Sequence, residues 1–378
     1  MTTGTEPVWV DNEAELERVA SHLGGARSLA IDTEADSFYH YFHKCCLIQI
    51  SDGHTDFLID SIAIKDPTAL APLLASVAPG KVLHAAEQDI LYLRRDFGFE
   101  LRPLFDTMVA AQLLGRKSIG LAGLLKESFG LTLDKVCQRD DWSRRPLTAR
   151  QMAYAAEDVR HLIRLSHALE AELEAHGRLA WAREEFEHIA RRAWSPREFD
   201  REDFWGLKGA RDLEPESAAV LRELYAVRDD RARAADVPPF RILSDETLVA
   251  LARRRPRSPA DLDGIKGFTP LVRRRIGPLV LAAAERGLDL PEAQRPTPPK
   301  GQGKRRTAAF RARVERLREW RRNRSAELGL DPGVLFPQST LDALAERGFP
   351  GLEQGDSIPG LRRWRREMLL PEAARLLA

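Results

Sequence analysis

The chain contains 378 residues with a formal net charge of +1, and 43% of them are hydrophobic, which is enough apolar material for two or three globular domains. No apolar run reaches the length of a membrane span, and the first residues lack the basic start and apolar stretch of a signal peptide, so we expect a cytoplasmic protein without membrane contact. The three cysteines are odd in number and lack metal-ligand spacing, which argues against a disulfide framework.

The first half of the chain contains several short apolar segments that predict strands and helices. In chain order they are a helix over Leu16–Leu23, strands over Leu29–Ile31, Leu47–Ile50 and Phe57–Ile59, a helix over Ala69–Val77 and a strand over Val82–Leu83. Early strands followed by strand-helix alternation indicate a mixed α/β sheet.

A pair of carboxylates stands at the end of the strand over Leu29–Ile31. Because side chains alternate along a strand, Asp32 and Glu34 are expected on one face. The alternative is that both are solvated acids at a strand end without a functional role. If instead they share a site, two adjacent carboxylates need a cation.

A third acid follows the strand over Val82–Leu83. That strand leads through His84 into a predicted helix, and Asp89 lies in the first turns of this helix. A histidine at a strand end is usually a hydrogen-bonded structural residue, so we do not count His84 among the candidate catalytic residues.

The fourth acid lies on a helix with a strong start signal. Thr148 followed by Gln151 forms a capping box, and apolar residues then recur at helical spacing. Tyr154 and Asp158 are four residues apart on this helix and therefore share one face. Taken alone, Tyr154 could equally be a core aromatic residue.

Four carboxylates gathered in one cleft would raise one another's pKa values by repulsion and desolvation, and divalent metal would remove that penalty. A ligand set of oxygens without His or Cys suits Mg²⁺ or Mn²⁺ and disfavours zinc. Two such ions about 4 Å apart would stabilise the attacking and leaving oxygens of a displacement at phosphorus.

At these residues the chain resembles the DEDD exonucleases of the tyrosine subgroup, and within them the ribonuclease D family. The D-x-E motif stands at Asp32–Glu34, the second motif at His84–Asp89 and the Y-x-x-x-D motif at Tyr154–Asp158. Two further segments, Phe105–Thr107 and Asp140–Thr148, are also similar to ribonuclease D. The order and spacing of three motifs make the resemblance specific.

The resemblance implies an α/β ribonuclease H-like nuclease domain with two bound divalent cations, Mg²⁺ or Mn²⁺. It implies that Asp32, Glu34, Asp89 and Asp158 hold these metals. It also implies that Tyr154 positions the attacking water through its hydroxyl group. All four acids and the tyrosine are present, which argues against an inactive enzyme.

The two halves of the chain differ in charge. Residues 1–190 carry 20 Lys and Arg against 29 Asp and Glu, a net charge of −9, whereas residues 191–378 carry 38 against 28, a net charge of +10. A basic half would attract the phosphate backbone of a nucleic acid, although a solvated arginine-rich surface has the same composition. The candidate contacts are Arg253, Arg254, Arg255, Arg273, Arg274, Arg275, Arg321–Arg322 and Arg362–Arg363.

The basic half contains an internal repeat, which predicts two copies of one helical module. The matched segments are Leu221–Leu224 with Leu317–Trp320, Arg228 with Arg324, Thr247–Ala252 with Thr340–Ala345, and Gly264–Phe268 with Ser357–Leu361. The order of helices and turns is similar to the HRDC domain, a small all-α domain associated with nucleic-acid binding and in some cases with protein contacts.

The resulting domain prediction has four parts. An exonuclease domain over residues 1–192 precedes a first HRDC-like domain over 210–288, and a second HRDC-like domain covers 307–378. Residues 289–306 are rich in Pro, Gly and basic residues and predict a linker.

Three functional hypotheses fit these features. The first is a metal-dependent 3′→5′ exoribonuclease acting on structured RNA, with tRNA precursors as the substrate that the resemblance suggests. The second is a DNA exonuclease, because no residue can be shown from sequence to read a 2′-hydroxyl. The third is a nucleic-acid-binding scaffold without activity, which the intact acids argue against.

Overall fold

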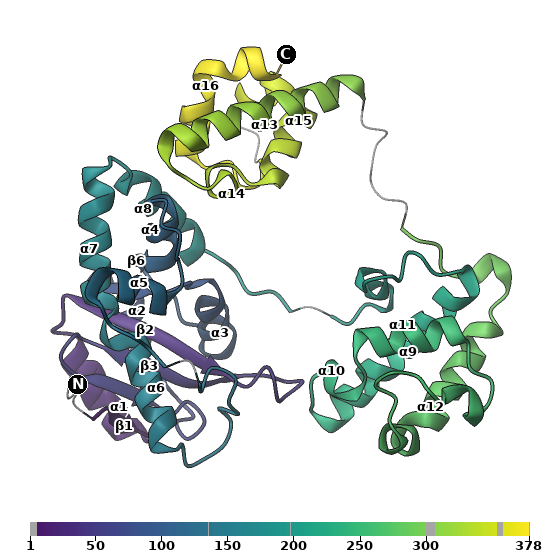
Figure 1. Cartoon of the computed structure of the whole chain (residues 1–378). Coiled ribbons are helices and arrows are strands. Elements are labelled where there is room, and N and C mark those ends of the chain that lie inside the picture. Colours follow the sequence, from purple (N-terminus) through teal and green to yellow (C-terminus); the bar gives the residue numbers. More distant parts are fainter. Residues whose placement is uncertain (1–5, 135, 197, 300–306, 354–357, 378) are drawn as a thin grey trace. The chain divides into compact units, whose positions relative to one another are not determined.

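The computed structural model describes residues 6–134, 136–196, 198–299, 307–353 and 358–377. The chain divides into two compact units, and each is considered by itself (Figure 1). The first unit comprises Met1–Ala35, Cys45–Trp194 and Arg305–Ala378, and the second comprises Asp36–Lys44 and Ser195–Lys304. Part of the predicted linker, residues 300–306, lies outside the described residues. Among the described helices, none combines the length and apolar composition that a bilayer crossing requires.

The first unit is built around a sheet in which six strands are described. In spatial order they are β1 (Val8–Val10), β4 (Asp56–Ile59), β3 (Cys45–Ser51), β2 (Ser28–Ala35), β5 (Gly80–Leu83) and β6 (Leu104–Asp106). The central strand β2 runs antiparallel to β3 and parallel to β5. The predicted mixed α/β sheet is therefore confirmed, and β2 extends beyond the expected segment to include both acids of the D-x-E motif.

The alternation of side chains along β2 separates the core from the site. Leu29 and Ile31 point into the main apolar core of this unit. Ala30 lies on the opposite face, in a small cluster with Val82 of β5 and Val159 of a covering helix. The acids at positions 32 and 34 share the face of Ala30, as the period of two predicts.

The helices between residues 13 and 190 cover both faces of this sheet (Figure 1). They are α1 (Glu13–Leu23), α2 (Ala71–Ala75), α3 (Glu87–Phe97), α4 (Thr107–Leu113), α5 (Leu121–Phe129), α6 (Ala149–Arg160), α7 (Leu162–Ala175) and α8 (Leu179–Ala190). The helix expected over Ala69–Val77 begins as a 3-10 turn, η1 (Thr68–Leu70), and α2 ends earlier than predicted, because Ser76 adopts an extended backbone.

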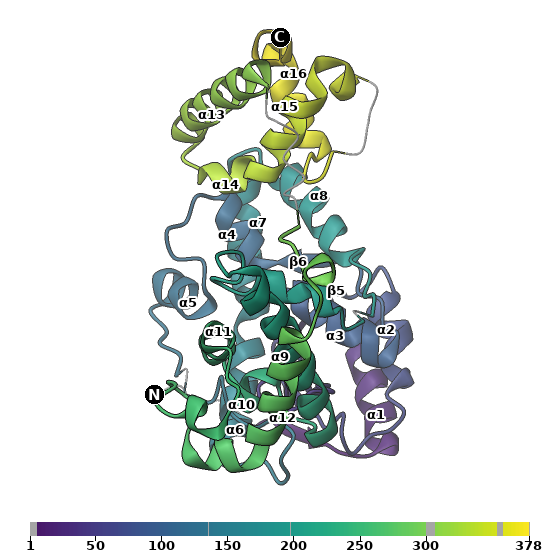
Figure 2. The ribbon, with the colours of Figure 1, turned by 90° about the vertical axis from the view of Figure 1, so that its right-hand side faces the viewer.

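The basic half contains the two expected helical modules (Figure 2). The helices of the first are α9 (Pro215–Ala235), α10 (Pro239–Ile242), α11 (Asp245–Arg254) and α12 (Pro270–Leu288). The 3-10 turn η2 (Arg201–Gly206) precedes α9, η3 (Pro259–Leu262) precedes α12, and η4 (Glu292–Gln294) follows α12. Those of the second are α13 (Ala308–Leu328), α14 (Pro332–Leu335), α15 (Gln338–Glu353) and α16 (Arg363–Leu377). Ser357, which begins the second matched turn, lies outside the described residues.

The turn of each module is fixed by the same contact. Thr247 donates a hydrogen bond to the carbonyl of Lys266, and Thr340 donates one to the carbonyl of Pro359. The next residue in each copy is a glycine with positive φ, Gly267 at +83° and Gly360, whose φ is +76°. A Cβ atom at either glycine would lie within 2.5 Å of the threonine hydroxyl, so a side chain is excluded there. The two threonines are 93 positions apart in the sequence, and so are the two glycines.

The expected match between Arg228 and Arg324 is wrong. Arg228 donates to the carbonyl of Leu243 at 3.3 Å, whereas the residue that makes the equivalent bond in the second module is Arg321, which donates to the carbonyl of Phe336 at 2.7 Å. These arginines are again 93 positions apart. The segments Leu221–Leu224 and Leu317–Trp320 are therefore not structurally equivalent, because their match is about one helical turn out of the register that relates the two modules.

Candidate metal centre

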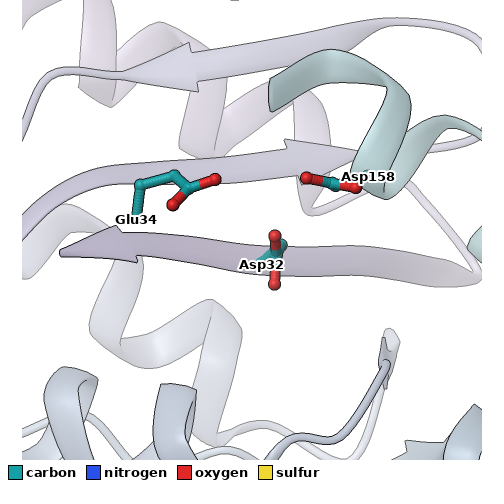
Figure 3. Close-up of side chains that lie close together, drawn as sticks. All are labelled: Asp32, Glu34 and Asp158. Atoms are coloured by element: carbon teal, nitrogen blue, oxygen red, sulfur yellow. The ribbon is translucent and has the colours of Figure 1, made fainter. Parts of the chain in front are cut away.

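Three of the predicted acids meet between β2 and α6 (Figure 3). One carboxylate oxygen each of Asp32, Glu34 and Asp158 can be chosen so that all three lie within 4.8 Å of one another. Asp32 and Glu34 come from β2, and Asp158 comes from the helix that covers this face. All three side chains are half-buried. Oxygen ligands at this spacing fit a hard divalent cation.

The position of Asp158 follows from the local sequence of α6. The helix begins at the capping box of Thr148 and Gln151, which confirms the predicted start. Ala155, Ala156 and Val159 are buried, so these small residues hold the helix against the sheet. Asp158 precedes Val159 and is thereby brought over β2.

The fourth acid, Asp89, lies close by but makes a different contact. It stands in the first turn of α3, as predicted, and is buried. The hydroxyl of Thr33 donates a hydrogen bond of 2.5 Å to its carboxylate. Asp89 does not belong to the group of three carboxylates, although its charge still raises the pKa of Asp32. The structure therefore brings three of the four predicted ligands together, and the fourth, Asp89, is hydrogen-bonded to Thr33.

The electrostatics of the cluster are those of a site that lacks positive charge. Burial raises the pKa of Asp32 well above its usual value, and repulsion from Asp89, Asp158 and Glu34 adds to the increase. The pKa of Glu34 is raised well above its usual value by burial and then by Asp158. Burial raises the pKa of Asp158 to about 7. A bound cation would reverse these shifts by favouring the charged carboxylates.

Tyr154 stands beside the cluster, one helical turn before Asp158 on α6. Its hydroxyl group interacts with the carboxylate of Asp158, and its ring lies 6.1 Å from the ring of Trp142, measured between centroids. Burial raises the pKa of Tyr154, and the charge of Asp158 raises it further. The phenol therefore stays protonated and acts as a hydrogen-bond donor.

The cluster opens into a cleft of about 340 Å³. Residues from several elements line it, namely Asp32, Thr33, Glu34, His84, Gly120, Leu121, Ala122, Leu133, Asp134, Gln138, Tyr154 and Asp158. His84 is hydrogen-bonded to Thr107, as expected of a structural residue, but it also faces this cleft. The sequence signal that could have placed His84 at the site is its position in the second motif, which begins at His84 and ends at Asp89.

The arginine clusters of the first helical module are exposed and partly engaged. Arg254 donates to the carbonyls of Asp261 and Asp263, and Arg255 forms an ion pair with Glu216. Arg273 pairs with Asp263. In the part of the chain that the structure describes, no hydrogen bond or ion pair occupies the guanidinium groups of Arg253, Arg274 and Arg275. These three members of the two arginine clusters are therefore available to pair with an external anion.

Two other predicted contacts with nucleic acid face protein instead. The guanidinium group of Arg321 donates to the carbonyl of Phe336. Arg362 pairs with Glu185 of α8 at 3.2 Å, and only 17% of its side chain is exposed. Arg321 therefore stabilises the second module internally and Arg362 joins it to α8, and the expectation that they contact a phosphate backbone is not supported.

Comparisons with known proteins agree with this architecture. A family model for 3′-5′ exonucleases matches residues 7–174, and the HRDC domain model matches residues 217–283 and 310–375. Ribonuclease D of Pseudomonas paraeruginosa is 33% identical, with 97% of this chain and 96% of that protein covered. Ribonuclease D of Xanthomonas oryzae pv. oryzae is also 33% identical, with 98% of both chains covered.

The crystal structure of Escherichia coli RNase D is similar over 98% of both chains, with a TM-score of 0.73 and 28% sequence identity. The predicted fold class, a ribonuclease H-like α/β nuclease domain followed by two all-α HRDC domains, is confirmed. The domain boundaries at residues 192, 210, 288 and 306 stay predictions. An exonuclease domain of the DEDD type implies the use of divalent metal. The chain therefore belongs to the ribonuclease D family and is a 3′→5′ exoribonuclease that acts on RNA.

Proposed function

We propose that hydrolysis takes place in the cleft between β2 and α6, with Asp32, Glu34, Asp89 and Asp158 as the ligands of two divalent cations, Mg²⁺ or Mn²⁺. The observation that carries this proposal is the group of three carboxylates within 4.8 Å, whose pKa values are raised by burial. Two bound cations would stabilise the attacking and leaving oxygens of an in-line displacement at phosphorus.

The proposal gives Asp89 a second partner. In the structure its carboxylate accepts a hydrogen bond from Thr33, and burial raises its pKa to about 7. A cation bound near Asp32 would favour the charged form of Asp89. The carboxylate could then bind the cation through one oxygen and keep Thr33 on the other, because each carboxylate has two acceptor oxygens.

Tyr154 is proposed to orient the attacking water. Its raised pKa keeps the hydroxyl protonated, and its interaction with the carboxylate of Asp158 would orient the phenol oxygen. The oxygen retains lone pairs that can accept a hydrogen bond from water. Tyr154 would therefore position the nucleophile beside the acids without giving up its own proton.

We further propose that the physiological substrates are tRNA precursors whose 3′ ends are trimmed. The similar E. coli protein is described as an exoribonuclease involved in structured RNA processing. The free arginines of the first helical module supply the charge that would hold the RNA body while its 3′ end enters the cleft.

The experiment compares two 5′-labelled RNAs, a tRNA precursor with a short 3′ trailer and an unstructured oligonucleotide with the sequence of that trailer. The full-length enzyme is expected to shorten both from the 3′ end with Mg²⁺ or Mn²⁺ and neither with EDTA. A lower KM is expected for the precursor. Cleavage in EDTA would contradict the metal proposal, and equal KM values at every salt concentration would contradict the proposal that the RNA body is bound.

A further inference from the structure

His84 is the one imidazole that lines the catalytic cleft within the described residues. It follows β5 directly, and its side chain is half-buried, so that one part contacts protein and the other faces the cleft. The proposed chemistry gives it no role, because neither metal binding nor orientation of water requires it. Its hydrogen bonds, however, define what it offers to a substrate.

The ring of His84 is held in one tautomer by Thr107. The Thr107 hydroxyl lies 3.2 Å from the carbonyl oxygen of Leu83, which can only accept, so this hydroxyl donates its single proton there. The same hydroxyl lies 2.9 Å from Nδ1 of His84 and has no second proton to give. We assign the ring proton to Nδ1, which then donates to this hydroxyl and leaves Nε2 as an acceptor.

The backbone around His84 is fixed just as firmly. Ala85 has a φ of 59°, a left-handed conformation that costs free energy in a residue with a Cβ atom. Asp106 holds this conformation, because its carboxylate accepts hydrogen bonds from the amides of Ala85 at 3.1 Å and Ala86 at 2.8 Å. A strained turn held next to a side chain that lines a cleft is typical of a functional position.

The protonation state of the ring agrees with this assignment. Burial lowers the pKa of His84 to about 4, so the ring is neutral at physiological pH. In the described part of the chain Nε2 has no hydrogen-bond partner, and it shares the cleft with the three clustered acids. In the proposed mechanism the acids bind metal and the Tyr154 oxygen binds water. Nε2 of His84 is a neutral acceptor that can receive a hydrogen bond from the substrate.

We infer that Nε2 of His84 accepts a hydrogen bond from the 2′-hydroxyl of the 3′-terminal nucleotide and thereby favours RNA ends over DNA ends. The terminal ribose must enter this cleft if hydrolysis takes place there, so the inference rests on the proposed function. Among the groups of a terminal nucleotide, the 2′-hydroxyl is a donor that RNA has and DNA lacks. A neutral acceptor suits it, whereas a protonated imidazole would offer only donors.

The test uses the full-length protein and three oligonucleotides of one sequence that end in a ribonucleotide, a 2′-deoxynucleotide or a 3′-deoxynucleotide. We expect loss of the terminal 2′-hydroxyl to slow single-turnover removal of that nucleotide by about three- to tenfold, as for one neutral hydrogen bond. In His84→Phe, which keeps a ring without an acceptor, the ratio between the ribo and 2′-deoxy ends should fall to about one. His84→Gln, which restores an acceptor, should recover part of the preference.

Thr107 provides the matched positioning control. Thr107→Val removes the acceptor that fixes Nδ1–H and should lower the ribo preference, whereas Thr107→Ser keeps the hydroxyl and should retain it. The ¹⁵N chemical shifts of His84 in the metal-free full chain report the tautomer directly, and a proton on Nε2 would overturn the inference.

An unchanged ratio in His84→Phe would also overturn the inference, and so would a preference that depends on the 3′-hydroxyl alone. If the wild-type protein removes neither end with metal present, the proposed function fails. In that event the same ratio is measured from the affinities of the ribo and 2′-deoxy oligonucleotides, so the role of His84 is still decided.

Discussion

Replacement of Asp158 by asparagine should make the metal-free protein more stable at alkaline pH, although it removes a proposed metal ligand. The carboxyl group of Asp158 has a pKa of about 7 in the folded protein because burial disfavours its charge, against an ordinary value of 3.8. Between these values the unfolded chain releases a proton that the folded chain retains. Stability therefore decreases as pH rises from about 4 to about 7 and stays low above pH 7.

The size of the effect follows from the same two pKa values. A shift of about three units corresponds to about 4 kcal/mol at pH 8, which is an upper limit because the side chain is partly open to solvent. Asparagine keeps an acceptor for Tyr154 and removes the charge that raises the pKa of Glu34. We therefore expect Asp158→Asn to stabilise the protein by about 1–3 kcal/mol at pH 8 and by a smaller amount at pH 5.

Urea denaturation in EDTA at both pH values measures the difference. Asp66→Asn is the matched control, since Asp66 is exposed and hydrogen bonds from Thr68 lower its pKa, so that its replacement should give no gain at pH 8. With saturating Mn²⁺ the wild type should be more stable than Asp158→Asn, because binding of the ion stabilises the wild type more. If Asp158→Asn destabilises the metal-free protein at pH 8, the free-energy cost assigned to burying the charge of Asp158 is wrong.

Three other predictions concern activity. Asp32→Asn should abolish hydrolysis while the circular dichroism spectrum is unchanged, and near-wild-type turnover would remove Asp32 from the site. Tyr154→Phe should lower the single-turnover rate by a factor on the order of a hundred without changing RNA affinity, whereas a variant as fast as the wild type would make Tyr154 a packing residue. The double variant Arg274→Ala, Arg275→Ala should weaken binding of a tRNA precursor and reduce the slope of log K against log salt by about 1–2. Replacement of the exposed Arg18 by alanine is the control. An unchanged slope in the double variant would show that Arg274 and Arg275 do not contact phosphate.

Local sequence was sufficient for the parts of the site that depend on one element. The period of two along β2 placed Asp32 and Glu34 on one face, and the capping box at Thr148 fixed the start of the helix that carries Tyr154 and Asp158. These features depend on residues within a few positions of one another. Local patterns therefore predicted which acids could meet.

Contacts between distant segments were not accessible in the same way. The hydrogen bond from Thr33 to Asp89 joins residues 56 positions apart, and the ion pair of Arg362 with Glu185 joins residues 177 positions apart. A run of arginines has the same sequence pattern whether it faces solvent or a carboxylate on another helix. The orientation of His84 likewise depends on Thr107, which only the fold brings near.

Crystals soaked in Mn²⁺ test the metal centre most directly, because anomalous scattering locates each ion without reference to activity. We predict two peaks about 4 Å apart, one among Asp32, Glu34 and Asp158 and the other with Asp89 as a ligand. A single peak within the three carboxylates, with Asp89 bound only to Thr33, would contradict the two-ion proposal. Manganese bound elsewhere, with none at these carboxylates, would contradict the account of the site as a whole.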